Sequence, residues 1–144
     1  MSRRALLAFA LILLAACRTA SGPDGLPPNF GIVEEGKIYR GAQPTAASIE
    51  ALARRGIRTI VKLNGASVAE EESAAARLGI RMLTVDLDAR TVGTASSCGD
   101  VERAYEAMTD PRNWPVYIHC THGRDRTGFL VGLYRERAEQ WPYP

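Results

Sequence analysis

Short apolar segments alternate with amphipathic segments along the chain. The strand-like segments are rich in β-branched side chains, and the helix-like segments place apolar residues three and four positions apart. Strands are expected at residues 57–63, 80–85 and 116–118, and helices at residues 45–54, 68–78 and 99–108. This alternation predicts a single α/β domain with a parallel-rich central sheet flanked by helices.

Polar residues form the turns and loops between these segments. Residues 34–37 read as a turn between two short strands, and residues 86–98 read as a polar loop. Thr45 or a neighbour is expected to cap the first helix. Three consecutive glutamates, residues 70–72, open the second helix, where we expect a solvated face that complements the helix dipole.

Residues 120–126 connect an apolar strand to an apolar helical segment, residues 129–134. The start of a helix binds anions through its free N–H groups and the positive end of its dipole, and Gly123 lets the backbone approach a phosphate closely. The turn therefore predicts a phosphate-binding loop. Its expected phosphate-binding residues are Thr121, His122, Gly123, Arg124, Asp125 and Arg126.

Cys120 begins this turn, where nearby N–H groups and the guanidinium of Arg126 favour its thiolate form. We therefore expect Cys120 to be a nucleophile at neutral pH. Arg126 can hold two phosphoryl oxygens, and the Thr127 hydroxyl can donate to the Cys120 sulfur. His119 is expected to brace the loop and tune Cys120 rather than transfer protons.

The sequence here resembles the cysteine-dependent protein tyrosine phosphatases of the small dual-specificity type. Their signature is His-Cys, five residues, Arg, then Ser or Thr and often Gly. The matching residues are His119, Cys120, Gly123, Arg126, Thr127 and Gly128. The resemblance extends to residues 38–44 and 56–63. It implies a phosphatase-like fold and hydrolysis of phosphate monoesters through a phosphocysteine at Cys120.

Such an enzyme needs one carboxylic acid to protonate the leaving oxygen and then to activate water. The resemblance places this acid on the loop that follows the strand at residues 80–85. Asp88 is the preferred candidate because it stands further into the loop, and Asp86, which continues the strand, is the alternative. Each can also be a simple strand-end or turn aspartate.

The cations near the loop favour phosphotyrosine or another phosphoprotein as the substrate. Arg124 and His122 are the candidates that join Arg126, which is few for a polyanionic inositol phosphate. The segment Gly-x-Asp-Arg-Thr also occurs in phosphoinositide phosphatases, so Asp125 keeps a phosphoinositide or inositol phosphate phosphatase open; its simpler role is to pair with Arg124 or Arg126. A rhodanese-like sulfurtransferase and an inactive phosphate-binding module are the remaining alternatives.

No metal and no cofactor is expected, because His119, Cys120 and His122 are too close in sequence to converge on one tetrahedral ion. Cys98, on the polar loop, has two interpretations. It is either a resolving thiol that forms a reversible disulfide with Cys120 or an unpaired loop cysteine too distant to do so.

The N-terminus resembles a bacterial lipoprotein signal. Two arginines precede an apolar run too short for a comfortable membrane span, and Leu14-Ala15-Ala16-Cys17 follows. We expect a signal peptide over residues 1–16, a lipidated Cys17 with a flexible tether to residue 29, and a catalytic domain over residues 30–144. An ordinary secretory signal or an uncleaved anchor is the alternative.

Cleavage before Cys17 would remove Arg3 and Arg4 and lower the formal net charge from +2 to zero. A neutral mature chain argues against nucleic acid as a partner. The resemblance implies a lipid-anchored protein of the bacterial cell envelope, on the periplasmic face. Arg18 after the cysteine, rather than aspartate, favours the outer membrane in a Gram-negative cell.

The first prediction concerns this anchor. The protein should partition with membranes, and Cys17→Ser should release it or leave it unprocessed, because the substitution removes the sulfur that carries the lipid. Mass spectrometry of the N-terminal peptide measures both. An unacylated N-terminus that starts at another residue would contradict the assignment.

Overall fold

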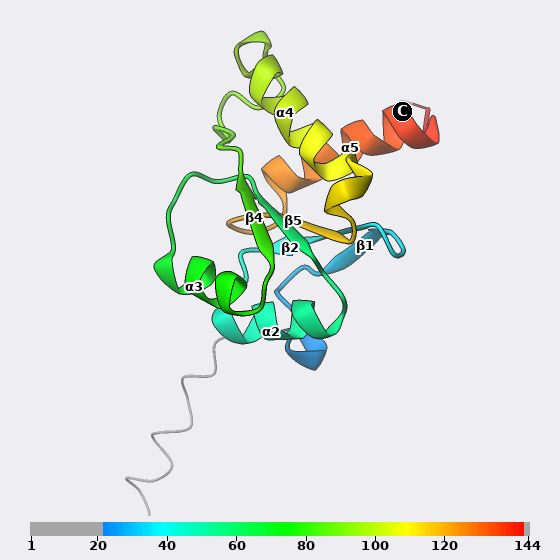
Figure 1. The fold of residues 1–144 in the computed structure, drawn as a ribbon. Coiled ribbons are helices and arrows are strands. Elements are labelled where there is room, and N and C mark those ends of the chain that lie inside the picture. The colour runs from blue at the N-terminus through cyan, green and yellow to red at the C-terminus, as the bar shows by residue number, and fades with distance from the viewer. Residues whose placement is uncertain (1–21, 143–144) are drawn as a thin grey trace, which may run out of the picture.

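A five-stranded sheet in the order β1-β2-β5-β3-β4 forms the centre of the computed structural model, which describes residues 22–142 (Figure 1). The strands are β1 Gly31–Glu34, β2 Ile38–Ala42, β3 Thr59–Lys62, β4 Arg81–Thr84 and β5 Val116–Cys120. The β1 strand is antiparallel to β2, and every other neighbouring pair is parallel. The predicted α/β fold with a parallel-rich sheet is confirmed.

The helices fall close to the segments that the sequence predicts. They are α2 Ala46–Arg54, α3 Ala69–Arg77, α4 Cys98–Thr109 and α5 Asp125–Glu139, with 3-10 turns η2 Pro23–Gly25, η3 Ala95–Ser97 and η4 Pro111–Asn113. Thr45 is the N-cap of α2, and its Oγ1 accepts a hydrogen bond from the Ser48 N–H at 3.2 Å. Local signals in the sequence therefore set this helix start.

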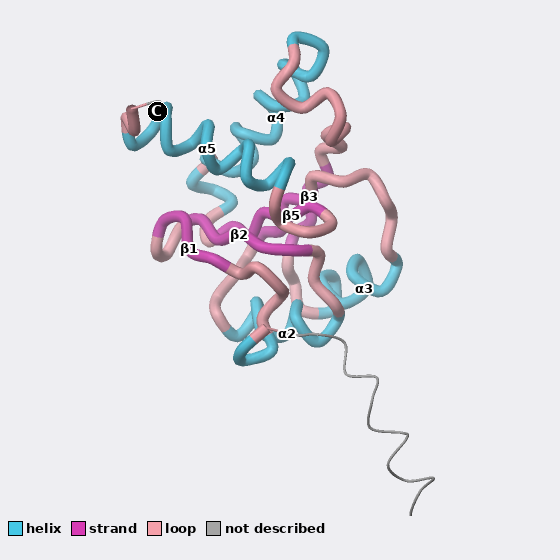
Figure 2. The backbone as a smooth tube through the Cα atoms, turned by 180° about the vertical axis from the view of Figure 1, so that it is seen from behind, coloured by secondary structure: helices cyan, strands magenta, loops and turns pink. Residues whose placement is uncertain are grey.

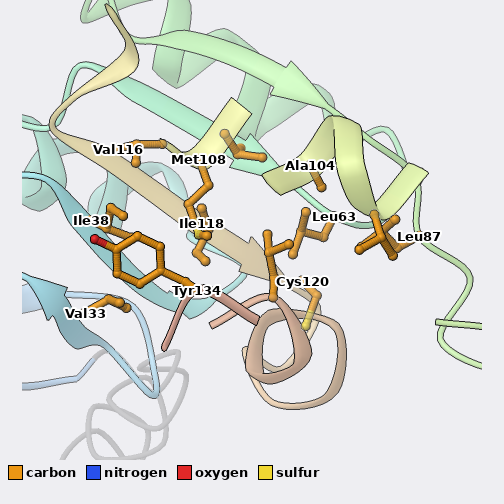
Figure 3. Packing of buried hydrophobic residues seen from close by; sticks show 13 residues of the cluster. Val33, Ile38, Leu63, Leu87, Ala104, Met108, Val116, Ile118, Cys120 and Tyr134 are labelled. Carbon is orange, nitrogen blue, oxygen red and sulfur yellow. The ribbon is translucent and has the colours of Figure 1, made fainter. Parts of the chain in front are cut away.

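Helices cover both faces of the sheet: α2 and α3 lie on one side, and α4 and α5 lie on the other (Figures 1 and 2). Side chains of successive strand residues point to opposite faces, so β5 contributes to both. Val116, Ile118 and Cys120 join the cluster with Tyr134 of α5 (Figure 3), whereas Tyr117 joins the cluster formed with α2 and α3. As a result, Cys120 and its neighbour His119 face opposite sides of the sheet.

The prediction that the glutamates at residues 70–72 form a solvated face is wrong for the middle one. Glu71 is 1% exposed, whereas Glu70 and Glu72 are exposed. The reason is geometric, since Glu71 lies three and four residues before the buried Ala74 and Ala75 and shares their inward face of α3. Its carboxylate is paired inside the protein rather than hydrated.

The expected signal peptide, residues 1–16, and the expected lipidation site, Cys17, lie outside the described residues. Between residues 22 and 142, none of the helices combines the length and the apolar character needed to cross a bilayer.

Candidate active site

The predicted phosphate-binding loop occupies the carboxyl end of the sheet. Cys120 is the last residue of β5, and α5 begins five residues later at Asp125. Because β2, β3 and β5 are parallel, their carboxyl ends meet at this edge, where open α/β sheets bind ligands. The free N–H groups of the α5 start therefore face the residues that connect it to β5.

Backbone packing holds the loop against the end of β2. Gly123 has φ +67°, and a Cβ atom there would lie 2.3 Å from the carbonyl carbon and oxygen of Gly41. The Gln43 N–H donates to the Thr121 carbonyl at 3.2 Å, and the Tyr117 hydroxyl donates to the Ala42 carbonyl at 2.6 Å. Glycine at position 123 therefore satisfies two constraints, a left-handed backbone and a close approach of two chains.

The Cys120 thiol is 3% exposed and surrounded by donors. Burial raises the pKa of Cys120, but the nearby Thr127 hydroxyl and the N–H groups of Thr127, Arg124 and Gly123 lower it by more, so the pKa falls below its ordinary value. This is the environment predicted for a thiolate nucleophile.

Arg126 links the phosphate-binding loop to the loop after β4. Its guanidinium donates to the Leu87 carbonyl and to Thr121 Oγ1, each at 3.3 Å. These bonds orient the planar guanidinium group beside the residues that follow Cys120. An arginine held in this way can present its remaining N–H groups to an oxyanion.

The two candidate acids have different surroundings. Asp86 Oδ1 accepts a hydrogen bond from the Gly65 N–H at 2.7 Å, which joins the ends of β3 and β4. Asp88 is exposed, adjoins Leu87, and pairs with Arg90 at 3.2 Å. The hydrogen bonds of Arg90 lower the pKa of Asp88, and the charge of Arg126 adds to this effect. Both carboxylates are exposed and each accepts a backbone N–H, from Gly65 at Asp86 and from Arg90 at Asp88, so the preference for Asp88 stays a prediction.

The remaining loop residues lie at the protein surface. Thr121, His122, Arg124 and Asp125 are all exposed. Within the described part of the chain, Asp125 forms no ion pair with Arg124 or Arg126, so the simpler role predicted for it is wrong.

Two residues outside the loop also hold it. Asn29 Nδ2 donates to the His122 carbonyl at 2.8 Å, and the Arg40 guanidinium donates to the Gly123 carbonyl at 3.4 Å. These bonds tie the N-terminal part of the domain to the loop.

Sequence reasoning missed two buried charges beneath the loop, Glu71 and Lys62. Glu71 Oε1 lies 2.8 Å from His119 Nε2, and its Oε2 lies 2.9 Å from Lys62 Nζ. Burial raises the pKa of Glu71, but His119 and Lys62 more than offset this and lower it. Lys62 itself was a signal, because it is a charged residue in a strand whose four residues are all buried.

Cys98 starts α4 rather than lying in the preceding loop. Its thiol is exposed and donates to the Thr94 carbonyl at 3.7 Å, and both Cys98 and Cys120 are free thiols. A cavity of about 260 Å³ beside Cys98 is lined by residues of α4, of α5 and of the segment before α4. Its lining includes no residue of the phosphate-binding loop. The disulfide between the two cysteines stays a prediction.

Comparison with known proteins identifies relatives of this arrangement. Residues 28–142 match the family described as PTP-NADK, a DSP-PTPase phosphatase fused to NAD+ kinase. The chain is 32% identical over 117 residues to inositol diphosphatase DSP5 of Arabidopsis thaliana, covering 80% of this chain and 56% of the relative. It is 26% identical over 129 residues to the dual specificity protein phosphatase TpbA of Pseudomonas aeruginosa, and this match covers 88% of this chain and 56% of TpbA. The chain thus spans little more than half the length of these relatives.

Solved structures show the same fold. The core catalytic domain of the PP-IP phosphatase SIW14 from S. cerevisiae, in complex with citrate, has a TM-score of 0.72 and 29% identity, covering 81% of this chain and 70% of that one. P. aeruginosa TpbA in complex with pTyr has a TM-score of 0.65 and 25% identity, and the match covers 86% of this chain and 70% of the TpbA chain.

The second prediction tests the donors around the sulfur. Thr127 is fully buried, so Thr127→Val should keep its shape while removing the hydroxyl that lowers the pKa of Cys120. The pKa of Cys120 should rise, and alkylation of Cys120 by iodoacetamide at neutral pH should slow. Peptide-resolved mass spectrometry measures this rate, with exposed Cys98 as the internal control. An unchanged pH profile for Cys120 would contradict the role given to Thr127.

Proposed function

This chain belongs to the DSP-PTPase phosphatases, and from that premise we propose that it hydrolyses phosphate monoesters through a phosphocysteine at Cys120. The observation that carries the proposal is the buried Cys120 sulfur beneath the start of α5, with its pKa lowered by the loop N–H groups and Thr127. The same donors that stabilise a thiolate also suit the oxygens of a phosphoryl group.

In the first step, the Cys120 thiolate attacks phosphorus. The S–P bond forms as the bond between phosphorus and the ester oxygen breaks, and Asp88 gives its proton to the leaving oxygen. Arg126, already oriented by Leu87 and Thr121, holds two phosphoryl oxygens in the transition state. For Asp88 to carry that proton, its ion pair with Arg90 must open.

In the second step, water attacks the phosphocysteine. The Asp88 carboxylate takes a proton from the water, the new P–O bond forms, and the S–P bond breaks. Inorganic phosphate leaves and the Cys120 thiolate is restored. The Thr127 hydroxyl stabilises the sulfur as a leaving group, just as it stabilises the resting thiolate.

Phosphotyrosine or another phosphoprotein is the substrate class that we propose first. The loop carries Arg124 and Arg126 against Asp125, a modest excess of positive charge that suits one phosphoryl group. The similarity to TpbA, which has been solved in complex with pTyr, also supports this class.

An inositol diphosphate is a second candidate, because a relative at 32% identity is an inositol diphosphatase and SIW14 is a PP-IP phosphatase. A polyanionic substrate would engage the exposed Arg90 and Arg124 as well as Arg126. Phosphate release from a phosphotyrosine peptide and from a diphosphoinositol phosphate, compared at low and high salt, separates the two classes.

The third prediction tests the covalent mechanism. Cys120→Ser should lower turnover of p-nitrophenyl phosphate at least about 10³-fold while oxyanion binding persists, because the hydroxyl keeps the shape but not the nucleophile. Arg126→Lys should lower kcat roughly 10²-fold or more, because a point charge cannot replace the bidentate guanidinium group. Steady-state assays and vanadate binding measure these effects.

One control accompanies that test. An assay with thiosulfate and cyanide on the same preparation detects sulfurtransferase activity. Retained turnover in Cys120→Ser, or sulfur transfer without phosphate release, would overturn the proposed function. Binding of vanadate without any turnover in the wild type would instead indicate an inactive phosphate-binding module.

The fourth prediction concerns the acid. Asp88→Asn should lower kcat roughly 10²-fold or more for substrates with poor leaving groups, and much less for p-nitrophenyl phosphate, whose leaving group needs no proton. Asp86→Asn is the matched control, because Asp86 is an exposed carboxylate two residues earlier that bonds to the Gly65 N–H at the end of β3. If Asp86→Asn has the larger effect, the acid is Asp86.

Arg90 allows a check by pH. Because Arg90 lowers the pKa of Asp88, Arg90→Gln should raise that pKa and keep the acid protonated to higher pH. The basic limb of the kcat profile should therefore move to higher pH. A limb that stays in place would show that it does not report Asp88.

A further inference from the structure

Three ionisable side chains are buried together beneath the phosphate-binding loop, on the face of the sheet opposite the Cys120 sulfur. Lys62 and Glu71 are each 1% exposed, and His119 is fully buried. A carboxylate removed from water in this way is costly unless its oxygens are paired and hydrogen-bonded. The proposed mechanism uses neither Glu71 nor Lys62, so their burial needs another explanation.

Both oxygens of Glu71 are occupied, but by different elements. Oε1 faces His119 Nε2 of β5 at 2.8 Å, while Oε2 accepts from Lys62 Nζ of β3 at 2.9 Å and from Gln43 Nε2 at 3.0 Å. The Oε1–Nε2 contact is close but not aligned as a hydrogen bond, and within the described residues neither atom has a hydrogen-bond partner elsewhere. An ionised carboxylate can only accept hydrogen bonds, so Nε2 can interact favourably with Glu71 only as a donor.

The other side of the same imidazole faces the nucleophile's own backbone. His119 Nδ1 lies 3.2 Å from the Cys120 carbonyl, and the ring stacks on Tyr117 with 5.8 Å between centroids. The His119 carbonyl accepts from the Leu63 N–H at 2.8 Å, so β3 also fixes this peptide. The orientation of the ring is therefore coupled to the direction in which the chain leaves β5.

We infer that Glu71 is a positioning residue of the active site, which orients His119 and through it holds the Cys120 sulfur beneath the N–H groups of the phosphate-binding loop. Lys62 keeps the Glu71 carboxylate in place and ionised, and Gln43 adds a third bond. The inference rests on the proposed function, because it concerns the same nucleophile, but it assigns a role to α3, which contributes no residue to the loop.

Positioning and simple charge predict opposite effects on the thiol. The charged or titratable groups placed around His119 and the loop are Glu71 of α3, Lys62 of β3, Tyr117 of β5, Arg40 of β2, Arg126 of α5 and Asp88 of the loop after β4. If only charge mattered, removing the Glu71 anion would favour the thiolate and move Cys120 alkylation to lower pH. If Glu71 positions the sulfur, its removal weakens the N–H contacts and moves alkylation to higher pH.

The experiment is the pH profile of Cys120 alkylation by iodoacetamide in the full chain, followed peptide by peptide with mass spectrometry. Glu71→Leu, which removes both the charge and the acceptor, should move the midpoint to higher pH and lower kcat for p-nitrophenyl phosphate severalfold more than it changes KM. Glu70→Leu, at an exposed neighbouring position on the same helix, is the matched control and should change neither. Alkylation needs no substrate, so it tests the inference even if the protein hydrolyses no phosphate ester.

A second variant separates positioning from a loss of folding. Glu71→Leu leaves Lys62 buried and unpaired, whereas Lys62→Met with Glu71→Leu removes both charges and still leaves His119 without its partner. A higher midpoint that persists in a cooperatively folded double variant supports the inference. A midpoint in that variant that equals the wild-type value or lies below it overturns the inference.

Discussion

A buried carboxylate joins the elements on which the phosphate-binding loop depends. Glu71 connects α3 to Lys62 of β3 and to His119 of β5, all within the protein interior. Desolvating each ion costs several kcal/mol, and removing one partner from such a group typically destabilises a protein by about 3–5 kcal/mol. The arrangement is therefore stable only when all three residues are present, and it sets α3 against the two strands that end at the active site.

Main-chain contacts impose the second constraint, at the other side of the loop. Gly123 touches the Gly41 backbone, and the Gln43 N–H bonds to the Thr121 carbonyl. These contacts involve no ionisable group, so the loop keeps its shape on this side at any pH at which the protein is folded. The phosphate-binding loop is thus held by a polar network beneath it and by backbone packing beside it.

Much of this architecture could be predicted from the sequence, because it depends on local signals. Apolar periodicity located the sheet and helices, Thr45 marked a helix start, and the spacing of Cys120, Gly123 and Arg126 located the loop. Glu71 could not be found in the same way. A run of three glutamates looks like a hydrated helix start, and only the packing of α3 on the sheet shows which of them faces inward.

The alternation of side chains along β5 has a consequence for how such a domain can evolve. The groups that stabilise the sulfur are mostly backbone N–H groups and buried residues, whereas the side chains of His122, Arg124 and Asp125 are exposed. Mutations at these outward positions can change which phosphorylated molecule is recognised without disturbing the nucleophile. Substrate preference can therefore diverge rapidly between relatives while the chemical step is inherited intact.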